Sequence, residues 1–84
     1  TFLDLSDNAI GEGGAAQLAT VLQVNSFLTI LRLRSNNVLD EGTKLLAQAL
    51  QVNSSLTSLT LNGNSISEPG AVELAAALRS NSTL

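Results

Sequence analysis

Apolar and polar residues alternate in a short segment near the middle of the chain. Leu31 and Leu33 fall on one face of an extended backbone, whereas Ile30, Arg32 and Arg34 fall on the other. A spacing of two residues predicts a short strand that is buried on one side. We therefore expect a strand over residues 30–34.

The spacing becomes helical further along the chain. Over residues 41–52 the apolar side chains recur at intervals of three and four, which predicts a helix with one buried stripe. Asp40 is the candidate N-cap, Pro69 is expected at the first helical position of the next copy, and Asn53 lies where a helix end favours a left-handed backbone. The stripe is expected to contain Gly42, Leu46, Leu50 and Asn53, with Thr43 and Ala49 beside it and Lys44, Gln48 and Gln51 pointing away.

This strand, loop and helix pattern recurs with a period of 28 residues, so the chain contains three copies, 1–27, 28–55 and 56–83. Leu84 has the phase of Leu28 and Leu56 and is expected to start a fourth copy. Such a period indicates a solenoid, in which each unit buries its apolar face against its neighbours. Neither end has the polar sequence of a terminal repeat, so neighbouring repeats are expected at both ends of this segment.

Stacking these units predicts a curved shape. Paired strands lie about 4.8 Å apart, whereas packed helices need about 8–10 Å. An arc with the strands inside satisfies both spacings. We expect an α/β fold with a parallel sheet on the concave face and helices on the convex face.

The repeated pattern LxxLxLxxNxIxxxGxxxLAxxLxxNxx, which begins at Leu28 in the middle copy, resembles a leucine-rich repeat of the 28-residue type found in ribonuclease inhibitor. The resemblance covers the whole chain and implies a right-handed leucine-rich-repeat solenoid with a horseshoe arc. The same type of repeat is found in NOD-like receptors, Ran GTPase-activating protein, tropomodulin-like actin regulators and several ciliary proteins. The resemblance alone therefore identifies no single function.

Composition narrows the function classes. The net charge is −3, and a clustered basic stripe is lacking, so no nucleic-acid partner is expected. The chain has no Cys and no His, which excludes thiolate metal sites and leaves Ser and Thr without an identifiable catalytic base. No apolar run approaches the roughly 18 residues of a membrane span. We expect no cofactor, no enzymatic activity, no membrane partner and a cytoplasmic (intracellular) location.

Two sets of recurring residues are expected to be structural. An asparagine follows the second strand leucine by three residues in each copy, where its amide can pair backbone groups as the chain leaves the sheet. A glycine near the start of each helix is expected to let helix and strand approach closely. These residues are Asn8, Asn36 and Asn64, and Gly14, Gly42 and Gly70.

Two other patterns have a structural interpretation. Glu12, Asp40 and Glu68 recur at one position, but helix starts about 8–10 Å apart cannot bring carboxylates to one metal ion, so helix capping is expected and no metal site. Asn53 and Asn81 each begin a glycosylation acceptor pattern. Because Asn25 fills the same position without that pattern, we interpret these asparagines as helix terminators.

A partner is expected to bind where the copies differ and face solvent. Phe2 and Ile30 are expected to form a small apolar spot, and Arg32 and Arg34 offer two guanidinium groups, of a residue type that is common in interfaces. An ion pair between Asp4 and Arg32 is the competing interpretation. The predicted grid on the concave face consists of Phe2, Asp4, Ser6, Ile30, Arg32, Arg34, Ser58, Thr60 and Asn62.

We therefore expect a non-enzymatic module, part of a larger protein, that binds a protein partner through the concave sheet. One alternative is a structural scaffold in a ciliary or cytoskeletal assembly, with contacts on the helical side. The others are the repeat arm of a NOD-like receptor and a Ran-type GTPase-activating protein. The last would need a catalytic asparagine or arginine on a concave loop, for which Arg34, Asn36 and Asn37 are the available residues.

Overall fold

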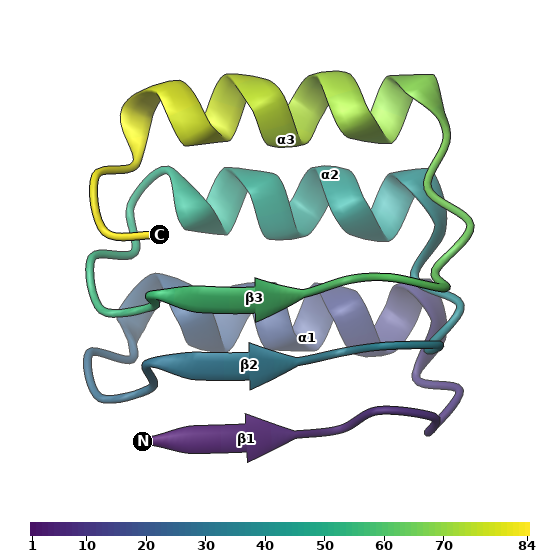
Figure 1. Cartoon of the computed structure of the whole chain (residues 1–84), viewed down its shortest axis with the longest axis horizontal. Helices are drawn as coiled ribbons and strands as arrows, with labels where there is room; N and C mark the ends of the chain where they lie inside the picture. Colours follow the sequence, from purple (N-terminus) through teal and green to yellow (C-terminus); the bar gives the residue numbers. More distant parts are fainter.

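The computed structural model describes all 84 residues and contains three strand–helix units in a row (Figure 1). Each strand is followed by a helix, and the helices stack in the same order as the strands. The strands form one parallel sheet in the order β1-β2-β3. The elements are β1 (Phe2–Asp4), α1 (Gly11–Val24), β2 (Ile30–Arg32), α2 (Leu39–Leu50), β3 (Ser58–Thr60) and α3 (Glu68–Ser80).

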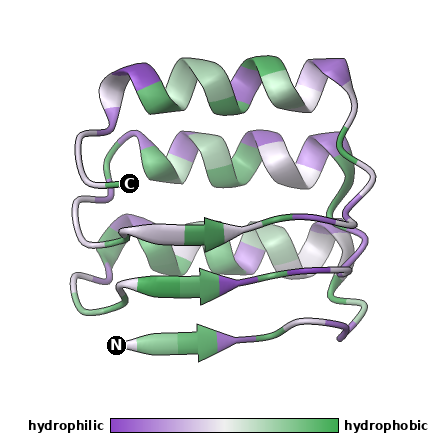
Figure 2. Ribbon diagram, viewed as in Figure 1, coloured by the Kyte–Doolittle hydropathy of each residue, from purple (hydrophilic) through white to green (hydrophobic).

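The core lies between the sheet and the helices. Leu31 and Leu33 point inward from the second unit and meet Leu46 and Leu50 of α2, and all four are buried. Figure 2 shows apolar residues on the strands and along the helices, with polar residues between them. Burying one such leucine stabilises the fold by about 1.5–3 kcal/mol. The two apolar spacings of the sequence therefore predicted this core correctly.

The strand in the middle copy is shorter than predicted, because it ends at Arg32 instead of residue 34. Ser35 has a φ of 55°, so the backbone turns away from the extended conformation there. The lateral pairing continues beyond the strand, since the Leu33 N–H donates to Thr60 O and the Ser35 N–H donates to Asn62 O. The backbone after each strand thus stays in register from one unit to the next.

Several residues other than glycine have a left-handed backbone, with positive φ, in the loops after the strands and at the start of α2. Asp7, Ala9, Ser35, Asn37 and Leu39 all have φ between 51° and 64°. Such a conformation costs about 1–2 kcal/mol for a residue with a side chain. The cost is offset because these turns place backbone N–H groups against the next unit, as where the Leu39 N–H donates to Asn64 O at 3.0 Å.

Two predictions about helix ends were wrong. Asp40 does not cap its own helix, because α2 begins one residue earlier, at Leu39, and Val38 at the N-cap position offers no side-chain hydrogen bond. Asn53, three residues after the end of α2, does not have the positive φ of a left-handed backbone, and its counterparts Asn25 and Asn81 are extended, with φ of −79° and −94°. Pro69 lies in the first turn of α3, where its missing N–H leaves no bond unmade.

Candidate functional site

The face of the sheet that points away from the helices, here called the open sheet face, brings together the predicted grid. Phe2, Ile30 and Ser58 are lateral neighbours in the sheet, and so are Asp4, Arg32 and Thr60. The third row, Ser6, Arg34 and Asn62, lies just beyond the strands. Lateral pairing continues there, because Arg34 O accepts the Asp7 N–H and Asn62 O accepts the Ser35 N–H.

The first row of the open sheet face has an apolar end. Phe2 is 51% exposed, and its lateral neighbour Ile30 is half-buried. The row ends in the small hydroxyl side chain of Ser58, which is exposed. The predicted apolar spot is therefore present and accessible.

Arg32 in the second row contacts the aromatic ring beside it. Its guanidinium carbon lies 4.7 Å from the centroid of the Phe2 ring, the geometry of a cation–π contact. No ion pair joins Arg32 to Asp4, so the competing interpretation of this pair is wrong. The stacked guanidinium keeps its donor edge free to bind an acceptor.

Asp4 is instead engaged within its own strand segment. Its carboxylate accepts a hydrogen bond from the Ser6 N–H at 2.9 Å. Hydrogen bonds from the Ser6 hydroxyl and N–H hold the pKa of Asp4 below its usual value, and the nearby Arg32 charge adds a smaller effect in the same direction. The carboxylate is therefore ionised at neutral pH, beside an arginine that it does not neutralise by contact.

Arg34 is the arginine of the open sheet face whose side chain has no partner within the chain. It is exposed, and its side chain makes no hydrogen bond or ion pair. Arg32 ends β2 and Arg34 lies two residues further, in the turn that follows, so the second and third rows of the open sheet face each carry one arginine. An arginine binds carboxylate with two parallel hydrogen bonds, and together the pair suits an acidic group beside the apolar spot.

Asn8, Asn36 and Asn64 form a ladder behind the open sheet face. Asn36 is fully buried; its Oδ1 accepts the Asn8 N–H at 2.9 Å, and its Nδ2 donates to Leu5 O at 2.8 Å. Asn64 repeats both bonds one unit later, with the Asn36 N–H and Leu33 O. Because the oxygen and the nitrogen of its side-chain amide are both hydrogen-bonded within the fold, Asn36 is not available to bind a ligand or a GTPase.

Gly42 and Gly70 lie against the preceding helix and not, as predicted, between a helix and its strand, whereas Gly14 lies against the residue before its own helix. A Cβ at Gly42 would lie 3.0 Å from the Ala15 Cβ of α1 and 2.7 Å from Val38 Cγ1. A Cβ at Gly70 would lie 2.5 Å from the Asp40 carboxylate. At Gly14 the nearest atom is the Ile10 Cβ of the preceding turn, at 2.6 Å.

In the acidic row of Glu12, Asp40 and Glu68, Asp40 caps the next helix in the stack. It accepts hydrogen bonds from the Ser67 N–H at 2.8 Å, the Gly70 N–H at 3.2 Å and the Ser67 hydroxyl. The Ser67 hydroxyl, followed by these N–H groups, lowers the pKa of Asp40. No group of three or more His, Cys, Asp or Glu residues comes together to hold a metal ion.

The sequence did not reveal what the asparagines at the helix ends do. Asn53 Nδ2 donates to Leu22 O at 2.8 Å, and Asn81 Nδ2 donates to Leu50 O at 2.8 Å, so each reaches back to the preceding unit. Their Oδ1 atoms accept N–H groups of the following turn, among them that of Leu56. The nitrogen to which a glycan would attach is thus already bonded.

Three further apolar side chains are exposed at positions that the sequence analysis did not consider. Val24 at the end of α1, Phe27 in the loop that follows and Val52 in the turn after α2 are 84%, 74% and 65% exposed. Val24 and Val52 share one position of the repeat, and Ser80 takes it in the third copy. This recurrence at a non-core position was the signal that could have identified them.

No helix is long and apolar enough to cross a membrane. In the comparisons with known proteins, the family model described as Leucine Rich repeat matches residues 1–19, 24–47 and 52–75. No curated protein matches the chain. Repeats of the matching family generally mediate protein–protein interaction, and the family is typically a non-enzymatic interaction module. The narrower resemblance to the ribonuclease-inhibitor type stays a prediction.

Proposed function

Because the chain belongs to the leucine-rich repeat family, we propose that it is a non-enzymatic module that binds a protein partner through the open sheet face. The proposal is supported by one observation: the open sheet face carries two arginines and an exposed apolar spot. Arg34 has no intramolecular partner, and Arg32 is stacked on Phe2 with its donors free. A partner that presents a carboxylate next to an apolar side chain would meet both features.

The proposal includes the shape and the setting of the module. Strands spaced more closely than helices favour an arc with the open sheet face on its concave side. Further repeats at both ends would extend that arc into a right-handed solenoid. A cytoplasmic location is in keeping with the absence of cysteine and with the engaged amide nitrogens of Asn53 and Asn81. No nucleic acid or membrane is needed as a partner.

The test uses quantitative affinity capture from cell extract, with the chain as bait. The open-face variant carries Arg32→Ala and Arg34→Ala. The matched control carries Lys44→Ala and Arg79→Ala on α2 and α3, which removes the same charge from exposed positions on the helices. We expect proteins that bind the parent and the control but are lost at least about tenfold with the open-face variant, in keeping with two arginines at the centre of an interface.

Equal capture by all three baits would contradict binding at the open sheet face. Loss with the helix-side control alone would favour the scaffold alternative, whose contacts lie on the helices. Phe27→Ala adds to that comparison, because Phe27 is 74% exposed and lies outside the open sheet face. Unchanged thermal unfolding of each bait shows that a loss of capture is not a loss of fold.

A further inference from the structure

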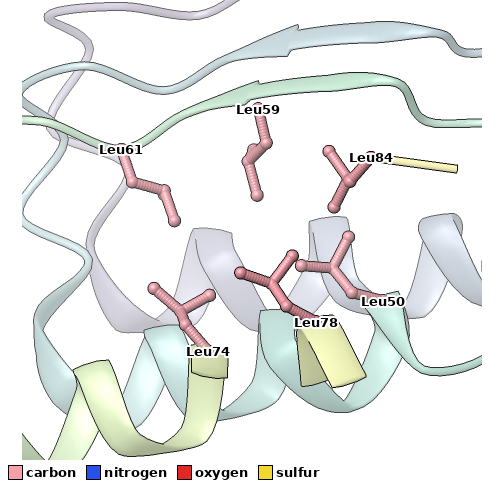
Figure 3. Close-up of a pocket in the computed structure, with 6 residues that line it drawn as sticks. All are labelled: Leu50, Leu59, Leu61, Leu74, Leu78 and Leu84. Atoms are coloured by element: carbon pink, nitrogen blue, oxygen red, sulfur yellow. The ribbon is translucent and has the colours of Figure 1, made fainter. Parts of the chain in front are cut away.

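The middle unit is the part of the open sheet face that has a neighbouring unit on each side. Beyond the third unit lies a hollow of about 250 Å³ that is lined only by leucines (Figure 3), and a further repeat of the proposed array would cover it. Ile30, Arg32 and Arg34, in contrast, have lateral neighbours in both flanking units. The environment of the two arginines is therefore that of an interior repeat.

Arg32 and Asp4 carry opposite charges and lie side by side in the sheet, yet they do not pair. They are register partners of β2 and β1. The Arg32 guanidinium lies over the Phe2 ring, 4.7 Å from its centroid, and the Asp4 carboxylate accepts the Ser6 N–H at 2.9 Å. Because Phe2 precedes Asp4 in the chain and Ser6 follows it, the two charged groups are drawn in opposite directions along the strands.

The bond from Ser6 is of a kind that aspartate forms readily. Its short side chain reaches the N–H two residues further along the chain and closes an Asx-type turn. The Ser6 hydroxyl and N–H also hold the pKa of Asp4 below its usual value, and the charge of Arg32 has a smaller effect in the same direction. The carboxylate beside Arg32 is thus ionised, but it is engaged with Ser6 and leaves the guanidinium free.

Arg34 has no carboxylate partner within the chain either. Its neighbours in the third row, Ser6 and Asn62, are uncharged. The Asp7 N–H donates to Arg34 O at 2.8 Å, but no ion pair joins the two side chains. Two successive rows of the open sheet face therefore each offer a guanidinium group with unused donors.

We infer that the hydrogen bond between Asp4 and Ser6 keeps Arg32 free for an acidic side chain of the partner, so that Asp4 is a positioning residue of the open sheet face. This role concerns the binding face itself and therefore rests on the proposed function. The acidic side chain is expected next to an apolar one, because Arg32 binds carboxylate beside the ring of Phe2. An ion pair between Asp4 and Arg32 would compete with the partner and weaken its binding.

Titration with butyrate, followed by nuclear magnetic resonance of the arginine Nε–Hε groups, tests this role on the chain. Butyrate carries a carboxylate on a short apolar chain, and butyramide is its uncharged counterpart. In the parent, butyrate is expected to shift the Arg32 and Arg34 signals until they saturate, and butyramide to leave them in place. Measurement at about pH 6 keeps butyrate and the carboxylate of Asp4 ionised.

Two substitutions of Asp4 separate its position from its charge. Asp4→Glu keeps the charge, but its longer side chain does not close the turn to Ser6 and can reach Arg32, so butyrate is expected to bind about two- to fivefold more weakly. Asp4→Asn keeps an acceptor for the Ser6 N–H and removes the charge, so butyrate is expected to bind as tightly as to the parent or up to about fivefold more tightly. Without butyrate, Asp4→Glu is expected to move the Arg32 signal in the direction in which butyrate moves it in the parent.

Equal affinity of Asp4→Glu and the parent for butyrate would overturn this role, because Asp4 would then act through its charge alone or not at all. Weaker binding by Asp4→Asn would also overturn it, and so would a parent whose arginine signals respond to butyrate no more than to butyramide. Thermal unfolding of each variant verifies that it is folded.

The titration needs no protein partner, so its failure and that of the proposed function are distinguishable. Capture of proteins through the open sheet face, together with equal butyrate binding by Asp4→Glu and the parent, would refute the role of Asp4 alone. The expected order of butyrate affinities, together with equal capture by all three baits, would contradict the proposed protein binding alone.

Discussion

At the scale of single residues, buried asparagines connect one unit to the next. A backbone that turns out of a sheet leaves N–H and C=O groups without strand partners, and an unpaired buried group costs about 1–3 kcal/mol. Asn36 supplies an acceptor to the Asn8 and Ile10 N–H groups and a donor to Leu5 O. One side chain therefore pairs three backbone groups of the preceding unit.

We predict that Asn36→Leu destabilises the chain by about 2–4 kcal/mol, because a leucine of similar size leaves these backbone groups unpaired at a buried position. Chemical denaturation followed by circular dichroism measures the change in the free energy of unfolding. Asn62→Leu is the matched control, since Asn62 is exposed and its side chain makes no hydrogen bond. The control is expected to change stability by less than about 0.5 kcal/mol. Equal stability of Asn36→Leu and the parent would refute the role of the ladder.

At the scale of the helices, close packing depends on glycine, which has no Cβ. Gly42 lies where α2 meets α1, and a Cβ there would lie 3.0 Å from the Ala15 Cβ and 2.7 Å from Val38 Cγ1. Overpacking of this kind costs about 1–3 kcal/mol. The gain in helix propensity from glycine to alanine, about 1 kcal/mol, opposes it.

Gly42→Ala is therefore expected to destabilise the chain by about 1–2 kcal/mol net. Gly13→Ala makes the same chemical change in α1, where no atom lies within 4 Å of the new methyl group. That variant gains helix propensity without a clash and is expected to be more stable than the parent by about 0.5–1 kcal/mol. Urea unfolding of the two variants measures both signs. A shift of both in the same direction would contradict the helix contact assigned to Gly42.

Asp40 connects two helices through charge. Hydrogen bonds from the Ser67 hydroxyl and N–H lower its pKa below the ordinary 3.8, so the folded chain holds the ionised carboxylate better than the unfolded chain does. A lowered folded pKa gives stability that is present above the unfolded value and is lost as the pH falls through the folded value. Asp40→Ala is thus expected to melt below the parent at pH 6, with a gap that narrows below pH 3.8.

Melting temperatures between pH 2 and pH 6 test this dependence. Glu41→Gln removes a carboxylate from the same turn of α2 but none of the bonds to Ser67 and Gly70, so its gap to the parent is expected to stay small throughout. A gap for Asp40→Ala that did not change with pH would show that the lost contact, and not the charge, stabilises α3.

At the scale of the whole molecule, what the sequence predicted depended on whether a feature repeats. The leucines recur in register, so periodicity alone located the strands, the helices, their buried faces and the members of the open sheet face. Contacts between units were harder to predict, because they join residues about 28 positions apart. Asp40 was predicted to cap its own helix, but its hydrogen-bond partners lie at the start of the next one. For Arg32 an ion pair with Asp4 was one interpretation, but its guanidinium contacts the ring of Phe2.

The last prediction follows from that dependence on neighbours. Leu50 and Leu78 share one position of the repeat, yet Leu50 is 1% exposed under the third unit and Leu78 is 53% exposed. Leu50→Ala is expected to cost about 2–5 kcal/mol, because it leaves a cavity at a junction. Leu78→Ala is expected to cost only about 1 kcal/mol, since little of its surface is buried on folding. Chemical denaturation of the two variants and the parent measures both losses in the free energy of unfolding. Equal losses would mean that each unit is stabilised by its own contacts and not by the stack.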